Sequence, residues 1–380
     1  MKYAHEFRDP KLAAGLLARL RATVARTAAT RDAPLHIMEV CGGHTHAIFR
    51  YGLHELVPPE IEFIHGPGCP VCVLPMGRVD DAITIAERKE VIFTTFGDAM
   101  RVPGTTKSLL QAKADGADVR MVYSPLDALA IARANPARQV VFFGLGFETT
   151  MPSTALTVLQ AAHEGIGNFT LFCNHITVPQ PIRALLDDRA MRLDGFVGPG
   201  HVSVVVGTRL YDFIASEYRK PIVVAGFEPL DLLQSVLMVV TQIADGRAEV
   251  ENQYGRVVSR DGNPQALASI DAVFETRERF EWRGLGEIDR SGVKIRAAYA
   301  DYDAERRFGV GYGRGREAAD PVEARCGDVL KGLIKPVACP LFGRACTPET
   351  PVGALMVSSE GACAAYHQFG GMRAREPALA

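Results

Sequence analysis

Short apolar runs alternate with amphipathic segments along most of this chain. Residues 11–28 carry apolar positions at helical spacing, which predicts an N-terminal helix. Beyond it, apolar runs of strand length recur and helical segments separate them. These runs cover residues 35–40, 61–66, 90–98, 119–124, 139–150, 169–177, 193–202 and 221–233. Such alternation predicts an α/β fold with parallel sheets built from βαβ units.

One helix start is marked clearly in the sequence. The stretch "SPLDALAIARA" begins with Ser124, a residue type that caps helices, and Pro125 fits a first helical turn. Asp127 is favoured near the positive end of the helix. We therefore expect this helix to begin at residue 125.

Polar side chains that could carry chemistry come directly after the predicted strands. In parallel sheets, ligands bind at the carboxyl ends of the strands, so these side chains are candidates for lining a cleft. Each could equally cap a helix or fix a loop, which is the commoner role. They are Cys41, Asp98, Glu148, His201 and Glu228.

A weak internal repeat suggests how the chain divides. "CGGHTH" is followed by "GPGC" at the same distance as "CNHIT" is followed by "GPGH". This predicts two similar Rossmann-like domains, residues 31–138 and 139–245, that face each other across a cleft. The alternative is that βα units resemble one another in any such fold. From residue 246 the chain is rich in Gly, Arg and turn residues, so 246–380 with 1–30 is expected to form a third, irregular domain.

Composition narrows the class of protein. The 380 residues have a net charge of −2 and no basic stripe, which argues against a nucleic-acid partner. No stretch approaches the roughly 20 apolar residues of a membrane span, and the charged N-terminus does not resemble a signal peptide. We therefore expect a cytoplasmic protein. There, the eight cysteines are more suited to metal binding or redox chemistry than to structural disulfides.

Half of the cysteines lie in the tail. Four thiolates in a loop-rich segment suit either an iron–sulfur cluster or zinc. Their irregular spacing and the neighbouring prolines favour a [4Fe–4S] cluster over zinc, with two disulfides a third reading. The four are Cys326, Cys339, Cys346 and Cys363.

The other cysteines differ in context. Cys69 and Cys72 form a CxxC pair that could make a disulfide, exchange electrons or supply two soft ligands, and Pro75 places it in a loop before a helix. Cys41, in "MEVCGGHTH", ends a strand, and a following helix N-terminus would favour its thiolate. The sequence supports two interpretations of Cys41 equally, a functional thiol and a small buried core residue. Cys173 is expected to be structural.

Several longer motifs together resemble the HypD family, whose members help to build the iron centre of [NiFe]-hydrogenases. The resemblance runs in order from about residue 38 to 366. The motifs are "MEVCGGHTHAIFRYG", "HGPGCPVCV", "FGDAMRVPG", "GFETTMPSTA", "NHITVP", "GPGHVSVVVG", "GFEPLDLL", "CPLFGRACTPETPVGA" and "MVSSEGACAAY". Relatives often carry a cysteine where this chain has Leu355, so no role is expected at that position.

The resemblance implies two Rossmann-like domains and a third domain with a [4Fe–4S] cluster held by the four tail cysteines. It implies a redox-active assembly scaffold rather than a conventional turnover enzyme. With a HypC-type chaperone and a HypE-type cyanide donor, the scaffold would hold Fe(II) while two cyanides and one carbon monoxide are attached, indirectly serving the hydrogenase large subunit. Cys41 would contact the iron, Cys69 and Cys72 would be the redox pair, and His44, His201 and Glu360 are further candidates.

Two other functions remain open at this stage. A cluster-dependent thiol–disulfide oxidoreductase would need Cys69 and Cys72 but not Cys41. A zinc-stabilised binding protein would be colourless and contain no iron. No GxGxxG, P-loop or GxSxG motif supports a nucleotide enzyme or a serine hydrolase.

Overall fold

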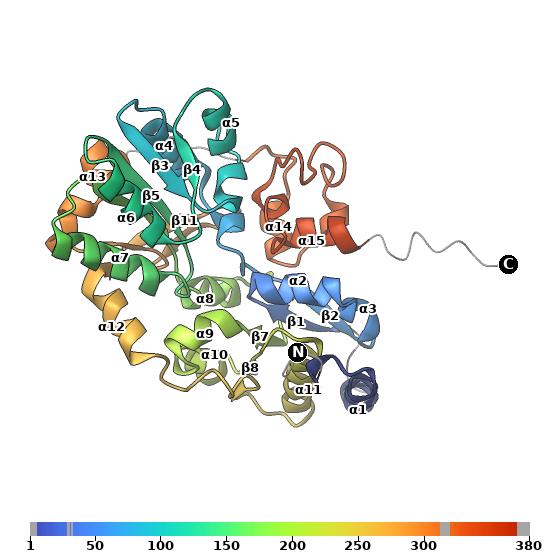
Figure 1. Ribbon diagram of the computed structural model, residues 1–380. Coiled ribbons are helices and arrows are strands. Elements are labelled where there is room, and N and C mark those ends of the chain that lie inside the picture. The colour runs from blue at the N-terminus through green and yellow to red at the C-terminus, as the bar shows by residue number, and fades with distance from the viewer. Residues whose placement is uncertain (1–5, 29–30, 32, 312–319, 371–380) are drawn as a thin grey trace.

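The computed structural model describes residues 6–28, 31, 33–311 and 320–370. Helices and strands alternate as predicted, and the N-terminal helix is confirmed as α1, Pro10–Ala28. Two separate parallel sheets organise the chain (Figure 1). The fold is therefore mixed α/β, as in Rossmann-like domains.

The larger sheet has five strands, all paired in parallel, in the order β2-β1-β7-β8-β9. Its strands come from two distant parts of the chain: β1 Leu35–Glu39, β2 Ile61–His65, β7 Gly195–Gly198, β8 Ile222–Val224 and β9 Val250–Asn252. The smaller sheet has four parallel strands in the order β4-β3-β5-β6. These are β3 Val91–Thr95, β4 Val119–Met121, β5 Gln139–Gly146 and β6 Phe169–His175.

Helices cover both faces of each sheet. On one face of the five-stranded sheet, apolar side chains of α1, α2, α3 and α11 form one core, and α8, α9 and α10 pack on the other face. The four-stranded sheet packs against α4, α5 and α13 on one side and against α6, α7 and α12 on the other. The bounds are α2 Gly42–Arg50, α3 Leu53–Leu56, α4 Met76–Ala86, α5 Leu109–Ala114, α6 Pro125–Ala134, α7 Met151–Glu164, α8 Pro179–Asp187, α9 Gly200–Val206, α10 Asp212–Ser216, α11 Pro229–Ala244, α12 Pro264–Val273 and α13 Ala304–Phe308.

The predicted start of α6 is confirmed in detail. The Ser124 hydroxyl accepts the N–H of Leu126 at 3.2 Å, and the Asp127 carboxylate accepts the N–H of Ser124 at 2.9 Å. Pro125 is the first helical residue. The groups that cap this helix all lie within its first turn, so the local sequence is enough to predict where it begins.

The sheets do not follow the predicted division at residues 138 and 139. β3 and β4 precede that point and β5 and β6 follow it, yet all four share one sheet. The chain leaves the five-stranded sheet after β2, builds the whole four-stranded sheet, and returns at β7. The two halves of the weak repeat therefore do not match two sheets, because β6 and β7 belong to different ones. Hydrophobic periodicity identifies strands but does not say which strands pair.

The segments expected to form a third domain are distributed over the molecule. Helix α1 packs against α11, and β9 completes the five-stranded sheet. Helix α12 and the antiparallel pair β10 Phe274–Thr276 and β13 Val293–Ile295 pack on the four-stranded sheet, and β11 Arg279–Trp282 pairs with β12 Gly286–Asp289. Residues 1–5, 29–30, 312–319 and 371–380 of that predicted domain lie outside the described residues.

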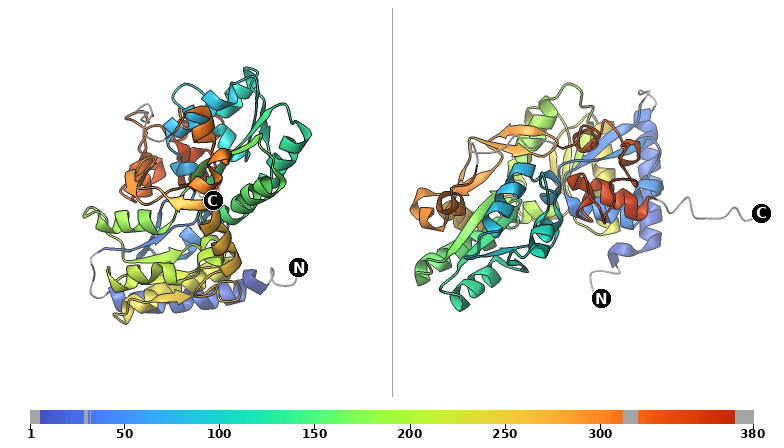
Figure 2. Two further views of the ribbon diagram at one scale, coloured as in Figure 1. Left: turned by 90° about the vertical axis from the view of Figure 1, so that its left-hand side faces the viewer. Right: turned by 90° about the horizontal axis from the view of Figure 1, so that it is seen from above.

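The cysteine-rich tail is a distinct, mostly irregular segment. Between residues 320 and 370 its α-helices are short, α14 Cys326–Leu330 and α15 Ala362–Phe369, and α15 lies beside α2 (Figures 1 and 2). Its apolar residues join the core on the face of the five-stranded sheet that α8, α9 and α10 cover. In the part of the chain that the structure describes, no helix combines the length and apolarity needed to cross a membrane.

Candidate functional site

A cavity of about 470 Å³ lies where the carboxyl edges of the two sheets face each other. On one side it is lined by residues that follow β1 and β7, and on the other by residues that follow β3 and β5. In each sheet the strand order reverses at these strands, between β1 and β7 and between β3 and β5. Ligands in open α/β sheets bind at such reversals. The fold therefore brings two binding edges to one cavity.

Cys41 lies at the end of β1 and lines this cavity. Gly42 begins α2 directly after it, and the Gly42 N–H donates to the Gly68 carbonyl at 2.8 Å. The two loops touch so closely that a Cβ on Gly68 would come within 2.3 Å of the Cys41 nitrogen. The thiol is thus held beside the loop that carries the CxxC pair.

The Cys41 thiol is not the activated thiolate that its place before a helix suggests. Burial raises its pKa to about 12, and the nearby carboxylates of Glu360 and Glu39 act in the same direction. Backbone hydrogen bonds from Gly43 and His44 lower the pKa but are outweighed. Desolvation therefore overrides the helix N-terminus here.

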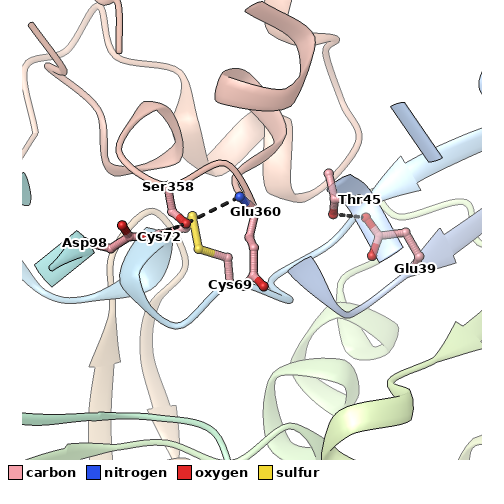
Figure 3. Close-up of a disulfide and its surroundings, with 7 residues drawn as sticks. All are labelled: Glu39, Thr45, Cys69, Cys72, Asp98, Ser358 and Glu360. Atoms are coloured by element: carbon pink, nitrogen blue, oxygen red, sulfur yellow. Dashed lines mark hydrogen bonds between the residues drawn. A yellow bond between two sulfur atoms is a disulfide. The ribbon is translucent and has the colours of Figure 1, made fainter. Parts of the chain in front are cut away.

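Cys69 and Cys72 form a disulfide, with 5.3 Å between their Cα atoms (Figure 3). The pair lies in the loop before α4, as predicted from Pro75, and both sulfurs are buried. The tail covers it: a Cβ on Gly361 would lie 2.9 Å from the Cys72 sulfur. Gly361 is two residues from Cys363, so the disulfide lies next to the cysteine-rich tail.

Two of the three additional candidates line the cavity. His201 and Glu360 contribute to its wall, and burial shifts both toward the neutral form, lowering the pKa of His201 and raising that of Glu360. The Glu360 N–H donates to the Ser358 hydroxyl at 3.4 Å, and that hydroxyl donates to the Asp98 carboxylate at 2.7 Å (Figure 3). Asp98 also lines the cavity.

His44 does not line the cavity. Its ring is fully buried, its Nε2 hydrogen bonds to the Ala225 carbonyl at 3.2 Å, and its centroid lies 4.8 Å from that of Phe227. Burial lowers its pKa to about 4, so it is neutral at physiological pH. The structure therefore places His44 behind the wall, between α2 and the end of β8.

The remaining strand-end residues have structural partners. Glu148 is buried and accepts the Val178 N–H at 3.1 Å, and Glu228 pairs with Arg8. Cys173 is buried in β6, and its sulfur lies 3.4 Å from the Val293 carbonyl. Its predicted structural role agrees with this position.

Sequence reasoning missed Glu39, which ends β1 two residues before Cys41. Its side chain is fully buried at the end of β1 and accepts hydrogen bonds from the Cys41 N–H, the Thr45 hydroxyl and His65. The signal was present in the sequence, because a carboxylate that directly follows the apolar residues Ile37 and Met38 in a buried strand needs buried partners.

The four tail cysteines are brought into one region. Burial raises the pKa of Cys363, and the charges of Cys326, Cys346 and Cys339 raise it further, so the four thiols lie within electrostatic reach. Three are buried and Cys339 is partly exposed. The Cys346 sulfur accepts the N–H groups of Val352 at 3.4 Å and Gly353 at 3.5 Å.

This donor set fits an iron–sulfur cluster, for which thiolate ligands and N–H···S bonds are usual. Within the described residues, no three His, Cys, Asp or Glu side chains are arranged as ligands of a single metal ion. The fit thus rests on the chemistry and grouping of the thiols rather than on a formed coordination geometry.

Comparison with known proteins gives a consistent result. The family model described as "HypD: Hydrogenase formation hypA family" matches residues 14–370. The hydrogenase maturation factor HypD of Rhodobacter capsulatus is 68% identical over 377 residues, covering 99% of this chain and 100% of that protein. The HypD of Escherichia coli is 56% identical, covering 97% and 98%, and HypD2 of Bradyrhizobium diazoefficiens is 53% identical, covering 98% of each. The chain therefore belongs to the HypD family of hydrogenase maturation factors.

Proposed function

We propose that this protein is the scaffold on which the Fe(CN)₂CO group of a [NiFe]-hydrogenase is assembled, in the cytoplasm, together with a HypC-type chaperone and a HypE-type cyanide donor. The observation that carries the proposal is the position of Cys41 in the cavity between the two sheets. The iron complex is the cargo in this proposal. A soft thiolate suits low-spin Fe(II) with strong-field diatomic ligands.

The surroundings of Cys41 suit a cargo that must be kept from water. The thiol is 6% exposed, and the cavity wall includes apolar residues from both sheets, among them Val71, Phe147 and Val202. Because burial holds the free thiol in its protonated form, binding of iron would release its proton. His201 lines the same cavity, and because burial lowers its pKa its neutral ring can take up that proton.

The Cys69–Cys72 pair would act as a two-electron store in this proposal. Opening the disulfide takes up two electrons and two protons, and closing it returns them. A [4Fe–4S] cluster on Cys326, Cys339, Cys346 and Cys363 would supply one-electron transfer when bound. The Cys72–Gly361 contact, two residues from Cys363, gives the tail and the disulfide a short connection.

The oxidoreductase alternative has less support. A substrate dithiol must reach one sulfur of the pair to form a mixed disulfide. Cys69 is 4% exposed and Cys72 is 1% exposed, and the tail covers them. An internal electron store agrees better with this burial than exchange with another protein.

The test compares two buried cysteines. Cys41→Ala and Cys173→Ala are purified anaerobically with the chaperone, and the infrared bands of iron-bound cyanide and carbon monoxide are recorded. We expect Cys41→Ala to lose the bands and the cargo iron while it keeps its brown colour and its sulfide content, and Cys173→Ala to keep the bands, the colour and the sulfide. Bands of wild-type intensity in Cys41→Ala would overturn the role of Cys41. A colourless, zinc-containing wild type would overturn the cluster.

A further inference from the structure

Glu39 is a buried carboxylate that accepts hydrogen bonds from three donors, one of which is the Cys41 N–H. Its Oε2 accepts the Cys41 N–H at 3.0 Å, and its Oε1 accepts the Thr45 hydroxyl and the His65 Nδ1–H, the latter at 2.9 Å. Figure 3 shows the Glu39–Thr45 bond. Since none of the Glu39 side chain is exposed, its charge depends on these donors.

The carboxylate and its two side-chain donors come from three elements that meet at the turn. Glu39 ends β1, His65 ends β2 and is its direct partner in the sheet register, and Thr45 lies in the first turn of α2. Cys41 lies between β1 and α2. The carboxylate therefore fixes the strand end, the neighbouring strand and the helix start on either side of the thiol.

His65 also contacts the tail. Its ring centroid lies 4.9 Å from that of Phe49 in α2 and 6.0 Å, edge on, from that of Tyr366 in α15. Phe49 and Tyr366 are themselves 4.4 Å apart. Helix α15 carries Cys363 three residues before Tyr366. One histidine thus contacts both the carboxylate behind Cys41 and the helix of a tail cysteine.

We infer that Glu39 and His65 form a positioning unit for Cys41, which holds the thiol at the cavity and ties its turn to α15. A carboxylate–histidine pair behind a metal ligand orients that ligand, and such second-layer partners affect metal retention strongly. The inference rests on the proposed function, in which Cys41 contacts the iron complex. Glu39 and His65 act through Cys41 and do not themselves line the cavity.

The first test measures backbone hydrogen exchange at Cys41 in the purified full-length protein. Glu39→Leu removes the acceptor but keeps similar volume, and we expect the exchange rate of the Cys41 amide to rise at least about tenfold, as for loss of a hydrogen bond to a charged group. Glu39→Gln keeps one acceptor oxygen and should preserve most of the protection. Tyr366→Ala, which removes the ring contact with His65, should give a smaller rise.

Asp231→Asn is the matched control. Asp231 is also fully buried, and it accepts hydrogen bonds from Arg256 and Gln253 in the first turn of α11, which follows β8, two strand positions from β1 in the same sheet. Asp231→Asn should leave the exchange rate of the Cys41 amide unchanged. Equal exchange in wild type and Glu39→Leu, or an equal rise in Asp231→Asn, would overturn the positioning role. No change in Tyr366→Ala would overturn the tie to α15.

A second readout separates this inference from the proposed function. Glu39→Leu, purified with the chaperone, should lose at least about nine-tenths of the cyanide and carbon monoxide bands, within the tenfold or greater effect typical of second-layer partners, while the brown colour remains. If wild type itself lacks the bands, the proposed function fails, and the exchange rates still decide the positioning role. If Glu39→Leu does not fold, Glu39→Asp replaces it, because the shorter side chain keeps the carboxylate but withdraws it from its donors. An unchanged exchange rate of the Cys41 amide in Glu39→Asp would overturn the inference.

Discussion

At the scale of single residues, burial decides the chemistry of this molecule more than local sequence does. Cys41 and His44 both lie at a helix start, where the positive end would favour a thiolate and disfavour a charged imidazole. The structure shows that desolvation is the largest influence on the pKa of each. The sequence places Cys41 and His44 directly after β1. Their protonation, however, depends on how completely other segments of the chain cover them.

Glu148 gives a pH-dependent prediction. Burial raises its pKa to about 7, above that of an unfolded glutamate, so the folded state binds its proton more tightly. The stabilising contribution is therefore present at low pH and is lost as pH rises toward 7, by up to about 3 kcal/mol. Glu148→Gln should remove this part of the pH dependence and be more stable than wild type at pH 8.

Chemical denaturation of both proteins at pH 5, 6, 7 and 8 measures the effect. The glutamine can still accept the Val178 N–H, so the hydrogen bond is kept while the charge is removed. Parallel pH profiles for wild type and Glu148→Gln would contradict the assignment.

At the scale of elements, a buried ion-pair network joins segments that sequence analysis assigned to different domains. Glu305 of α13 accepts hydrogen bonds from Arg78 of α4 and from Arg277, each at 2.5 Å. Arg78 also donates to the Asn174 side chain of β6 at 2.5 Å. The network thus fixes α13 against the four-stranded sheet.

Glu305→Gln should destabilise the protein strongly. It leaves two nearly buried guanidinium groups without their carboxylate, and breaking a buried pair in this way costs about 3–5 kcal/mol. The free energy of unfolding in urea measures the loss. Glu164→Gln is the control, since its pair with Arg133 is exposed and contributes little to stability. Similar losses in both variants would contradict the importance of the network.

The individual elements were largely predictable. The capping box of α6 and the loop position of the CxxC pair follow from neighbouring residues alone. Strand pairing was not predictable, because β1 joins β7 across more than a hundred intervening residues and nothing in either strand specifies that partner. For the same reason, periodicity gave no indication that α1 and β9 would pack with the five-stranded sheet.

At the scale of the whole molecule, the cavity depends on both sheets. Cys41 belongs to the five-stranded sheet, while Thr149 lines the opposite wall from the four-stranded sheet and is exposed. Thr149→Trp should fill the cavity and abolish the cyanide and carbon monoxide bands without lowering the melting temperature. Ser153→Trp, at an exposed site in α7 outside the cavity wall, should retain both the infrared bands and the melting temperature. Full bands in Thr149→Trp would show that the cargo lies elsewhere.

The order of strands also has a consequence during synthesis on the ribosome. The strands of the four-stranded sheet are contiguous in the chain, so they can pair as soon as β6 has emerged. In the five-stranded sheet, β1 and β2 can pair only with each other until β7, β8 and β9 arrive. Glu360 completes the cavity wall only near the end of translation. We therefore expect Cys41 to remain uncovered through most of synthesis, so that a nascent chain exposes the very thiol that the finished protein encloses.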